Sequence, residues 1–155
     1  MTVQAFPHIA TKLYIPETRP QVVFRRQLID RLDHCTDYKL LLVTAPAGFG
    51  KTTLLSQWTQ ESDDPIAWVS LDENDNDPIR FWSYTAAALE RLEPRVAQHL
   101  LPLLHSSRPE MHYVIPTLIN AVADVEDDFI LIFDDYHTID CENIHTELAQ
   151  LIDYL

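Results

Sequence analysis

The two glycines of this chain constrain its fold more than any other feature. They are Gly48 and Gly50, two positions apart, and the other 153 residues contain none. Glycine tolerates left-handed backbone and lets the main chain approach a ligand closely. An apolar run, LLLVT at 40–44, precedes them, and residues 51–60 follow with apolar side chains at helical spacing. The sequence therefore predicts a buried strand, a glycine turn and a helix in direct succession.

Such a turn can bind phosphate. Inward-pointing backbone N–H groups, with a helix N-terminus behind them, solvate phosphate oxygens in place of water. The turn follows the pattern G-x-x-x-x-G-K-[ST], except that Ala45 replaces the first glycine. In this pattern Lys51 would reach the β- and γ-phosphates of ATP, and the Thr52 hydroxyl would bind Mg²⁺. The residues expected to contact the nucleotide in this turn are Ala45, Pro46, Ala47, Gly48, Phe49, Gly50, Lys51, Thr52 and Thr53.

Two other interpretations of the turn are open. It could be an ordinary connection between a strand and a helix. It could also begin a dinucleotide-binding G-x-G-x-x-G fingerprint, with Asp72 as the acid that binds the ribose. Thr53 stands where that fingerprint needs its third glycine, and the fingerprint leaves Lys51 unexplained. The phosphate loop is therefore the favoured interpretation.

A second motif supplies carboxylates. The apolar segment 129–133 (FILIF) predicts a buried strand, and Asp134 and Asp135 follow it directly. Ligands of open α/β sheets bind at the carboxyl ends of the strands. We expect Asp134 to hold Mg²⁺ through water and Asp135 to orient or activate the attacking water. Asp135 and Lys51 are thus the predicted catalytic residues, and Thr52 and Asp134 the predicted metal ligands.

The order of elements predicts the fold class. Strands are expected at 40–44, 66–71 and 129–133, and helices at 22–32, 51–60, 80–92, 117–125 and 141–155, with Pro78 at a helix start. Four prolines between 94 and 116 predict only short helices and loops there. Strands that alternate with helices indicate an α/β protein with a parallel sheet covered on both faces.

Composition excludes several classes of protein. With 24 acidic and 11 basic residues the net charge is −13, so the chain is a poor candidate for contacting nucleic acid itself. No apolar run approaches the roughly 20 residues of a membrane helix, and the first residues lack a secretory signal, so the cytoplasm is the expected compartment. Cys35 and Cys141 form no Cys-x-x-Cys pattern, which indicates neither a disulfide framework nor a zinc site.

Other candidate residues are less specific. The loop 72–77 (DENDND) resembles a calcium loop, but Asp77 replaces its glycine and Ser83 its final glutamate, so calcium is rejected. His137 could sense the γ-phosphate or lie on the surface. Arg25, with Arg26, could approach the base or ribose, or belong to a solvated helix face. The tryptophans are expected in the core, at positions 58, 68 and 82.

Several blocks in order resemble a known family. They are TKLYIP at 11–16, Arg19-Pro20, V-x-R-x-x-L at 23–28, APAGFGKTTLLSQW at 45–58, WVSLDENDNDP at 68–78 and DDYH at 134–137. Together they resemble the N-terminal ATPase of MalT-like regulators, the large LuxR-type transcriptional activators of the STAND class. Alanine at the position of Ala45 is usual in that family. The resemblance runs from about Thr11 to the end of the chain.

The resemblance implies a nucleotide switch with a P-loop NTPase fold, a three-layer parallel sheet. In the family, ATP and a small-molecule or protein inducer favour a self-associating form, ADP favours a monomeric one, and a C-terminal helix-turn-helix domain binds DNA. Residues 1–34 would precede the ATPase core, and 35–155 would form part of it.

The family's next strand, which would carry a residue that reads the γ-phosphate, lies beyond Leu155. We therefore expect a fragment with an incomplete sheet, which binds nucleotide weakly, hydrolyses it negligibly and aggregates. Two alternative functions are a P-loop small-molecule kinase and a nucleotide-binding interaction module without turnover.

Overall fold

The computed structural model describes residues 9–18, 21–35 and 37–155. Arg19 and Pro20, which contribute to the family resemblance, lie outside the described residues. The chain divides into two compact units, one formed by Met1–Tyr14 with Pro65–Leu155 and the other by Ile15–Asp64. The predicted domain boundary at residue 34 stays a prediction.

The larger unit contains a pair of parallel strands. β1 (Ile66–Ser70) pairs with β2 (Ile130–Asp134), in a register that runs from Ile66 opposite Ile130 to Ser70 opposite Asp134. Parallel neighbours need a long crossover connection, and here the chain between Ser70 and Ile130, which contains three helices, supplies it. The predicted strands at 66–71 and 129–133 are confirmed, and the mixed helix and strand structure is compatible with the α/β class. The three-layer P-loop sheet stays a prediction.

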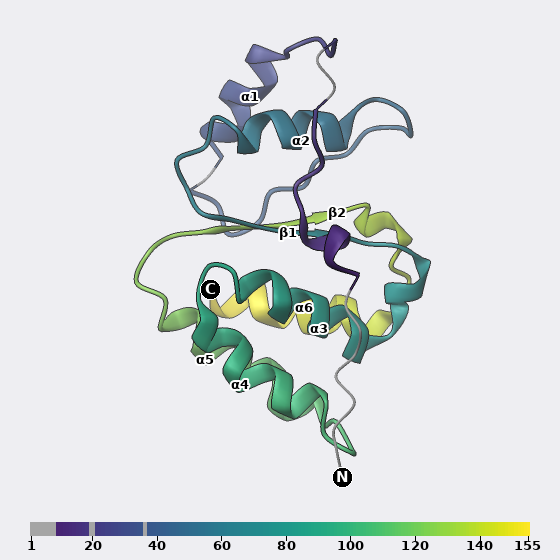
Figure 1. The fold of residues 1–155 in the computed structure, drawn as a ribbon, viewed down its shortest axis with the longest axis vertical. Coiled ribbons are helices and arrows are strands. Elements are labelled where there is room, and N and C mark those ends of the chain that lie inside the picture. The colour runs from purple at the N-terminus through teal and green to yellow at the C-terminus, as the bar shows by residue number, and fades with distance from the viewer. Residues whose placement is uncertain (1–8, 19–20, 36) are drawn as a thin grey trace. The chain divides into compact units, whose positions relative to one another are not determined.

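Four helices of this unit lie on one side of the strand pair (Figure 1). They are α3 (Pro78–Leu89), α4 (Pro94–Leu104), α5 (Met111–Ala123) and α6 (Glu142–Tyr154). Short 3-10 turns complete the unit: η1 (Ala10–Leu13), η2 (Glu73–Asn76) and η3 (Tyr136–Thr138). None of the helices within the described residues combines the length and the apolar character needed to cross a membrane.

Aromatic side chains dominate the core of the larger unit. Phe81 is fully buried, its ring stacks on Phe133 with a centroid distance of 5.1 Å, and Trp82 meets it edge-on. Trp68 and Trp82 are buried in this unit, and Trp58 is buried in the other, so the expected core positions of all three tryptophans are confirmed.

The prediction of short helices and loops between residues 94 and 116 is wrong. Helices α4 and α5 run continuously through Pro102 and Pro116. Both prolines are exposed, so water can satisfy the carbonyl groups that they leave without a helical partner. The opposite faces of the two helices are buried, through Val96, Ala97, Leu100 and Leu104 in α4 and Val114, Ile115, Leu118 and Val122 in α5. Burial of these faces outweighs the cost of one proline in each helix.

The smaller unit contains two helices, α1 (Arg26–Asp33) and α2 (Lys51–Thr59). Helix α2 matches the predicted helix 51–60, whereas α1 begins four residues later than predicted. The predicted buried strand at 40–44 is wrong, because these residues form no strand and Leu42 is 73% exposed. Strand structure requires a hydrogen-bonded neighbour, and the described part of this unit holds no other strand. An apolar run alone therefore did not determine a strand here.

Smaller errors concern helix ends. Helix α3 starts at Pro78 and ends at Leu89, where 80–92 was predicted, because Asp77 caps it and accepts a hydrogen bond from the Arg80 N–H. Helix α5 starts six residues before the predicted Thr117. Strand β2 begins at Ile130 and includes Asp134. Boundaries of this kind depend on capping contacts more than on periodicity.

A contact between α3 and α6 leads us to predict that the stability of the protein depends on pH. The Trp82 Nε1 donates a hydrogen bond of 2.6 Å to Glu147 Oε2. Burial raises the pKa of the Glu147 carboxyl, although the hydrogen bond from Trp82 acts in the opposite direction. The folded state therefore binds this proton more tightly than the unfolded state, so the free energy of unfolding falls as the pH rises through the carboxyl's titration range.

Glu147→Gln should remove this contribution, because the amide stays neutral and its oxygen can still accept from Trp82. Urea unfolding at pH 4 and pH 7 should show that wild type loses stability relative to Glu147→Gln at the higher pH. Glu142→Gln, an exposed change on the same helix, is the control. Equal pH dependence in all three proteins would contradict the prediction.

Candidate functional site

The glycine turn adopts the backbone that only glycine favours. Gly48 has φ of +80° and Gly50 has φ of +75°. A Cβ built on Gly48 would meet nothing within 4 Å, so at this position the reason for glycine is backbone conformation rather than space within the protein. Gly50 is the N-cap of α2, and a Cβ there would lie 3.6 Å from the Arg25 guanidinium. The sequence thus predicted the glycine turn before α2 correctly. The structure shows that both glycines have positive φ.

The N-terminus of α2 directly follows this turn. Its N-cap, Gly50, can provide no side-chain hydrogen bond, and none is made. The first amides of a helix have no partner within the helix, and the helix dipole adds partial positive charge there. The backbone around Gly50 therefore fits an anionic group such as a phosphate.

Lys51 places its ammonium group over the turn. The Nζ donates hydrogen bonds to Ala45 O at 2.8 Å and to Pro46 O at 3.4 Å. Two carbonyls that solvate an ammonium also hold it at the loop. A bound phosphate would compete with these carbonyls for the same charge. Thr52 follows Lys51 in the first turn of α2 and is half-buried.

Arg25 contacts the same loop. Its Nη1 donates a 2.9 Å hydrogen bond to Phe49 O, and Phe49 itself is 60% exposed. This contact ties the start of α1 to the glycine turn, so Arg25 helps to hold the loop. Arg26, in contrast, pairs with Asp30 and Glu61 on the surface of the same unit. A contact of Arg25 with nucleotide stays a prediction.

The predicted acids lie at the carboxyl end of β2, as expected. Asp134 is the last residue of the strand and is 6% exposed, and its carbonyl accepts a 3.0 Å hydrogen bond from the Leu71 N–H. Asp135 follows with φ of +58° and an exposed side chain. His137 Nδ1 lies 3.7 Å from Asp135 Oδ1, so these two exposed side chains are neighbours.

The structure brings the predicted site residues together in two groups. The glycine turn, Lys51, Thr52 and Arg25 belong to the unit of residues 15–64, and Asp134, Asp135 and His137 belong to the other unit. No group of three or more His, Cys, Asp or Glu residues among the described positions could hold a metal ion by itself. Coordination of one Mg²⁺ by Thr52 and Asp134 stays a prediction.

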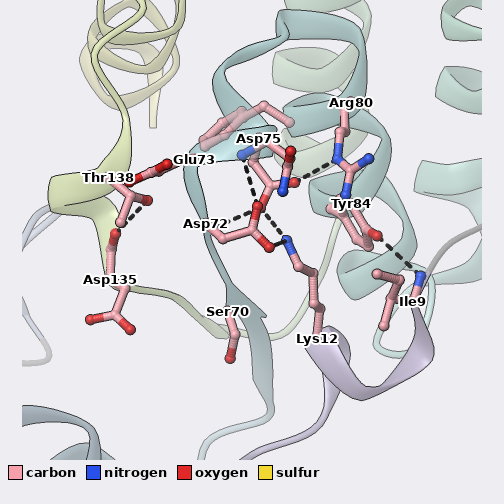
Figure 2. A network of polar contacts seen from close by, with 12 residues as sticks. Ile9, Lys12, Ser70, Asp72, Glu73, Asp75, Arg80, Tyr84, Asp135 and Thr138 are labelled. Atoms are coloured by element: carbon pink, nitrogen blue, oxygen red, sulfur yellow. Dashed lines mark hydrogen bonds and ion pairs between the residues drawn. The ribbon is translucent and has the colours of Figure 1, made fainter.

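Sequence reasoning missed a buried ionic network around η2. Asp75 is fully buried, and the Lys12 ammonium and the Arg80 guanidinium both bind its carboxylate, Arg80 at 2.8 Å (Figure 2). Lys12 Nζ also lies 2.7 Å from Asp72 Oδ2. The bond from Lys12 lowers the pKa of the Asp72 carboxyl, and the bond to Asp75 raises the pKa of the Arg80 guanidinium. Asp72 is thus part of the scaffold, which argues against its interpretation as a ribose-binding acid.

One sequence signal could have revealed the capped turn at the centre of this network. Asp72 and Asp75 form a reciprocal capping box, in which each side chain accepts a backbone N–H of the turn. A capping residue such as Ser, Thr, Asp or Asn, followed three residues later by a side chain that can accept the N-cap N–H, is the pattern of such a box. The sequence predicts only a loop at 72–77 (DENDND), because nothing in its local sequence indicates that Lys12, 63 residues away, contacts Asp75.

Known proteins show similarity over nearly the whole chain. No family model matches it. The HTH-type transcriptional regulator MalT of Vibrio cholerae is 30% identical over 148 residues, which is 95% of this chain and 16% of that protein. MalT of Serratia proteamaculans is 37% identical, over 88% of this chain and 15% of that protein. The serine/threonine-protein kinase PknK of Mycobacterium tuberculosis is 31% identical, over 98% and 14%.

Most of this chain is thus similar to a segment found both in proteins named as MalT regulators and in a protein named as a kinase. The chain spans about one sixth of the length of the relatives it matches, or slightly less.

Proposed function

We propose that this chain is the ATP-binding, ATP-hydrolysing switch segment of a signal-responsive transcriptional regulator. The observation that carries the proposal is the glycine turn, where two positive-φ glycines lead directly into the uncapped N-terminus of α2 and Lys51. Backbone amides, a helix N-terminus and an ammonium group converge on one loop. This is the chemistry that a polyphosphate requires.

Each predicted residue has a role in this function. Backbone amides of residues 45–53 would bind the phosphate oxygens, except at Pro46, which has no N–H, and at Phe49, whose N–H donates to Pro46 O. Lys51 would exchange its loop carbonyls for the β- and γ-phosphates. Thr52 and Asp134 would hold Mg²⁺, which neutralises phosphate charge when it is bound. Asp135, exposed at the end of β2, would orient the attacking water.

The names of the relatives support a control module rather than a domain that itself binds DNA or phosphorylates protein. One set is named as transcriptional regulators and another as protein kinases, yet both match nearly all of this chain with a small share of their own length. A segment common to both is better explained as a control module than as the part that binds DNA or phosphorylates protein. The net charge of −13 agrees that DNA would be bound elsewhere. The partners proposed are ATP or ADP, an inducer and further copies of the protein.

Lys51→Ala tests the proposal. Loss of a charge-assisted hydrogen bond is worth about 1.5–3 kcal/mol, so ATP affinity should fall about 10- to 150-fold. Titration of a fluorescent ATP analogue measures it. Lys39→Ala is the matched control, since Lys39 is an exposed lysine of the same unit and should leave affinity unchanged. Equal ATP affinity in wild type and Lys51→Ala would refute the proposal.

A further inference from the structure

The Asn76 side chain joins two turns that are far apart in the sequence. Its Nδ2 donates to Glu73 O at 3.1 Å and to Thr138 O at 2.8 Å. Its Oδ1 accepts from the N–H groups of Asp140 and Cys141, at 2.6 and 3.0 Å. A side-chain amide has two donors and one oxygen with two lone pairs, so every hydrogen-bonding position is used. The orientation is also determined, because Nδ2 faces carbonyls and Oδ1 faces amides.

The segment that Asn76 holds carries the acid end of β2. At its start, the Leu71 N–H binds Asp134 O and so ties it to β1. At its end, Asn76 binds residues 138–141. Between these two sets of hydrogen bonds, Asp135 O accepts from the Thr138 N–H and from the Thr138 hydroxyl. Figure 2 shows the hydrogen bond from the hydroxyl. Hydrogen bonds therefore hold the turn at residues 135–141 at both ends and in its middle.

Asp135 needs this support. It is the one residue other than glycine with positive φ among the described residues. Left-handed backbone is unfavourable for a residue with a Cβ, and it persists where the surrounding structure determines it. This backbone sets the direction of the Asp135 Cα–Cβ bond, so contacts that fix residues 135–141 limit the positions that the exposed carboxylate can reach.

The η2 turn provides a rigid base for Asn76. Asp75, the residue before it, is fully buried and bound by Lys12 of η1 and Arg80 of α3 (Figure 2). The capping box between Asp72 and Asp75 closes the turn at its other end. Asn76 thus links the turn that contains the buried Asp75 to the turn that follows β2.

We propose that Asn76 is a positioning residue that holds the 135–141 turn in the conformation on which the water-orienting role of Asp135 depends. This rests on the proposed function, because Asp135 has a role only if ATP and Mg²⁺ bind. Asn76 itself binds backbone groups of Glu73 within η2 and of residues 138–141, so its effect on Asp135 passes through the 135–141 turn.

The first test measures, without nucleotide, the hydrogen bonds that Asn76 accepts from Asp140 and Cys141. In Asn76→Ala, hydrogen exchange of the Asp140 and Cys141 amides should accelerate at least about tenfold, since both lose their acceptor. Asn76→Asp keeps an acceptor for these amides and should restore their protection. Glu73→Ala, an exposed change on the same turn, is the control. Unchanged exchange in Asn76→Ala would overturn the proposal.

The second test measures ATP turnover by the intact protein. Because Asp135 would orient the attacking water, Asn76→Ala should lower the hydrolysis rate at saturating ATP and Mg²⁺ about tenfold, while the Kd for ATP stays within about twofold. In an Asp135→Asn background, Asn76→Ala should cause no further reduction in rate, because the two residues act through one carboxylate.

The outcomes separate the two proposals. Additive effects of Asn76→Ala and Asp135→Asn on the hydrolysis rate, or an unchanged rate in Asn76→Ala, would overturn the positioning role and leave the proposed function intact, provided that ATP binding still depends on Lys51. If wild type binds no ATP, or if Lys51→Ala binds ATP as well as wild type does, the proposed function fails and the positioning role fails with it.

Discussion

Asp75→Ala should destabilise the larger unit by about 3–5 kcal/mol, the usual cost of removing one partner from a buried ionic group. The Asp75 side chain has no exposure to solvent and accepts from Lys12, Arg80 and the Asp72 N–H. Its removal leaves Lys12 largely buried with Asp72 as its remaining partner in the network, and it also opens the capping box. Urea unfolding followed by tryptophan fluorescence measures the loss.

A neighbouring acid provides the comparison. Asp77 caps α3 through a 2.8 Å hydrogen bond from the Arg80 N–H, but its side chain is exposed. Asp77→Ala should cost about 1 kcal/mol, as the loss of a helix cap usually does. A similar cost for both variants would show that the buried network contributes no more than a cap.

Phe81→Ala should cost about 3–5 kcal/mol, because it removes a fully buried aromatic ring and leaves a cavity. The ring stacks on Phe133 at 5.1 Å and meets Tyr136 edge-on at 6.5 Å. Phe133 lies in β2 and Tyr136 in η3, on either side of the acid pair. The cavity would therefore form directly beneath the segment that carries Asp134 and Asp135.

Tyr113→Ala is the control for Phe81→Ala, since Tyr113 is 59% exposed on α5. Surface changes of this kind are usually within about 0.5 kcal/mol of wild type. Both variants are compared by urea unfolding. A Phe81→Ala protein as stable as Tyr113→Ala would mean that the aromatic cluster does not determine the stability of this unit.

Prediction from sequence succeeded where a local pattern and a tertiary environment agreed. The helix after Gly50, the strand after Pro65 and the acids at the end of β2 all follow from short-range periodicity and composition. It failed at residues 40–44, where the apolar run found no strand partner, and at Pro102 and Pro116, where buried faces maintained helices that local propensity disfavours.

By itself, the sequence determined the chemistry that the chain can offer. Two glycines followed by a lysine and a threonine predict a loop for phosphate, and an apolar strand that ends in two acids predicts a carboxylate edge, because these patterns depend on residues adjacent in the chain. Only the tertiary structure decided which residues support that edge. Lys12 meets Asp75 across 63 positions, and Asn76 meets Thr138 across 62. Contacts at such separations arise when the chain buries its core, so no local pattern encodes them.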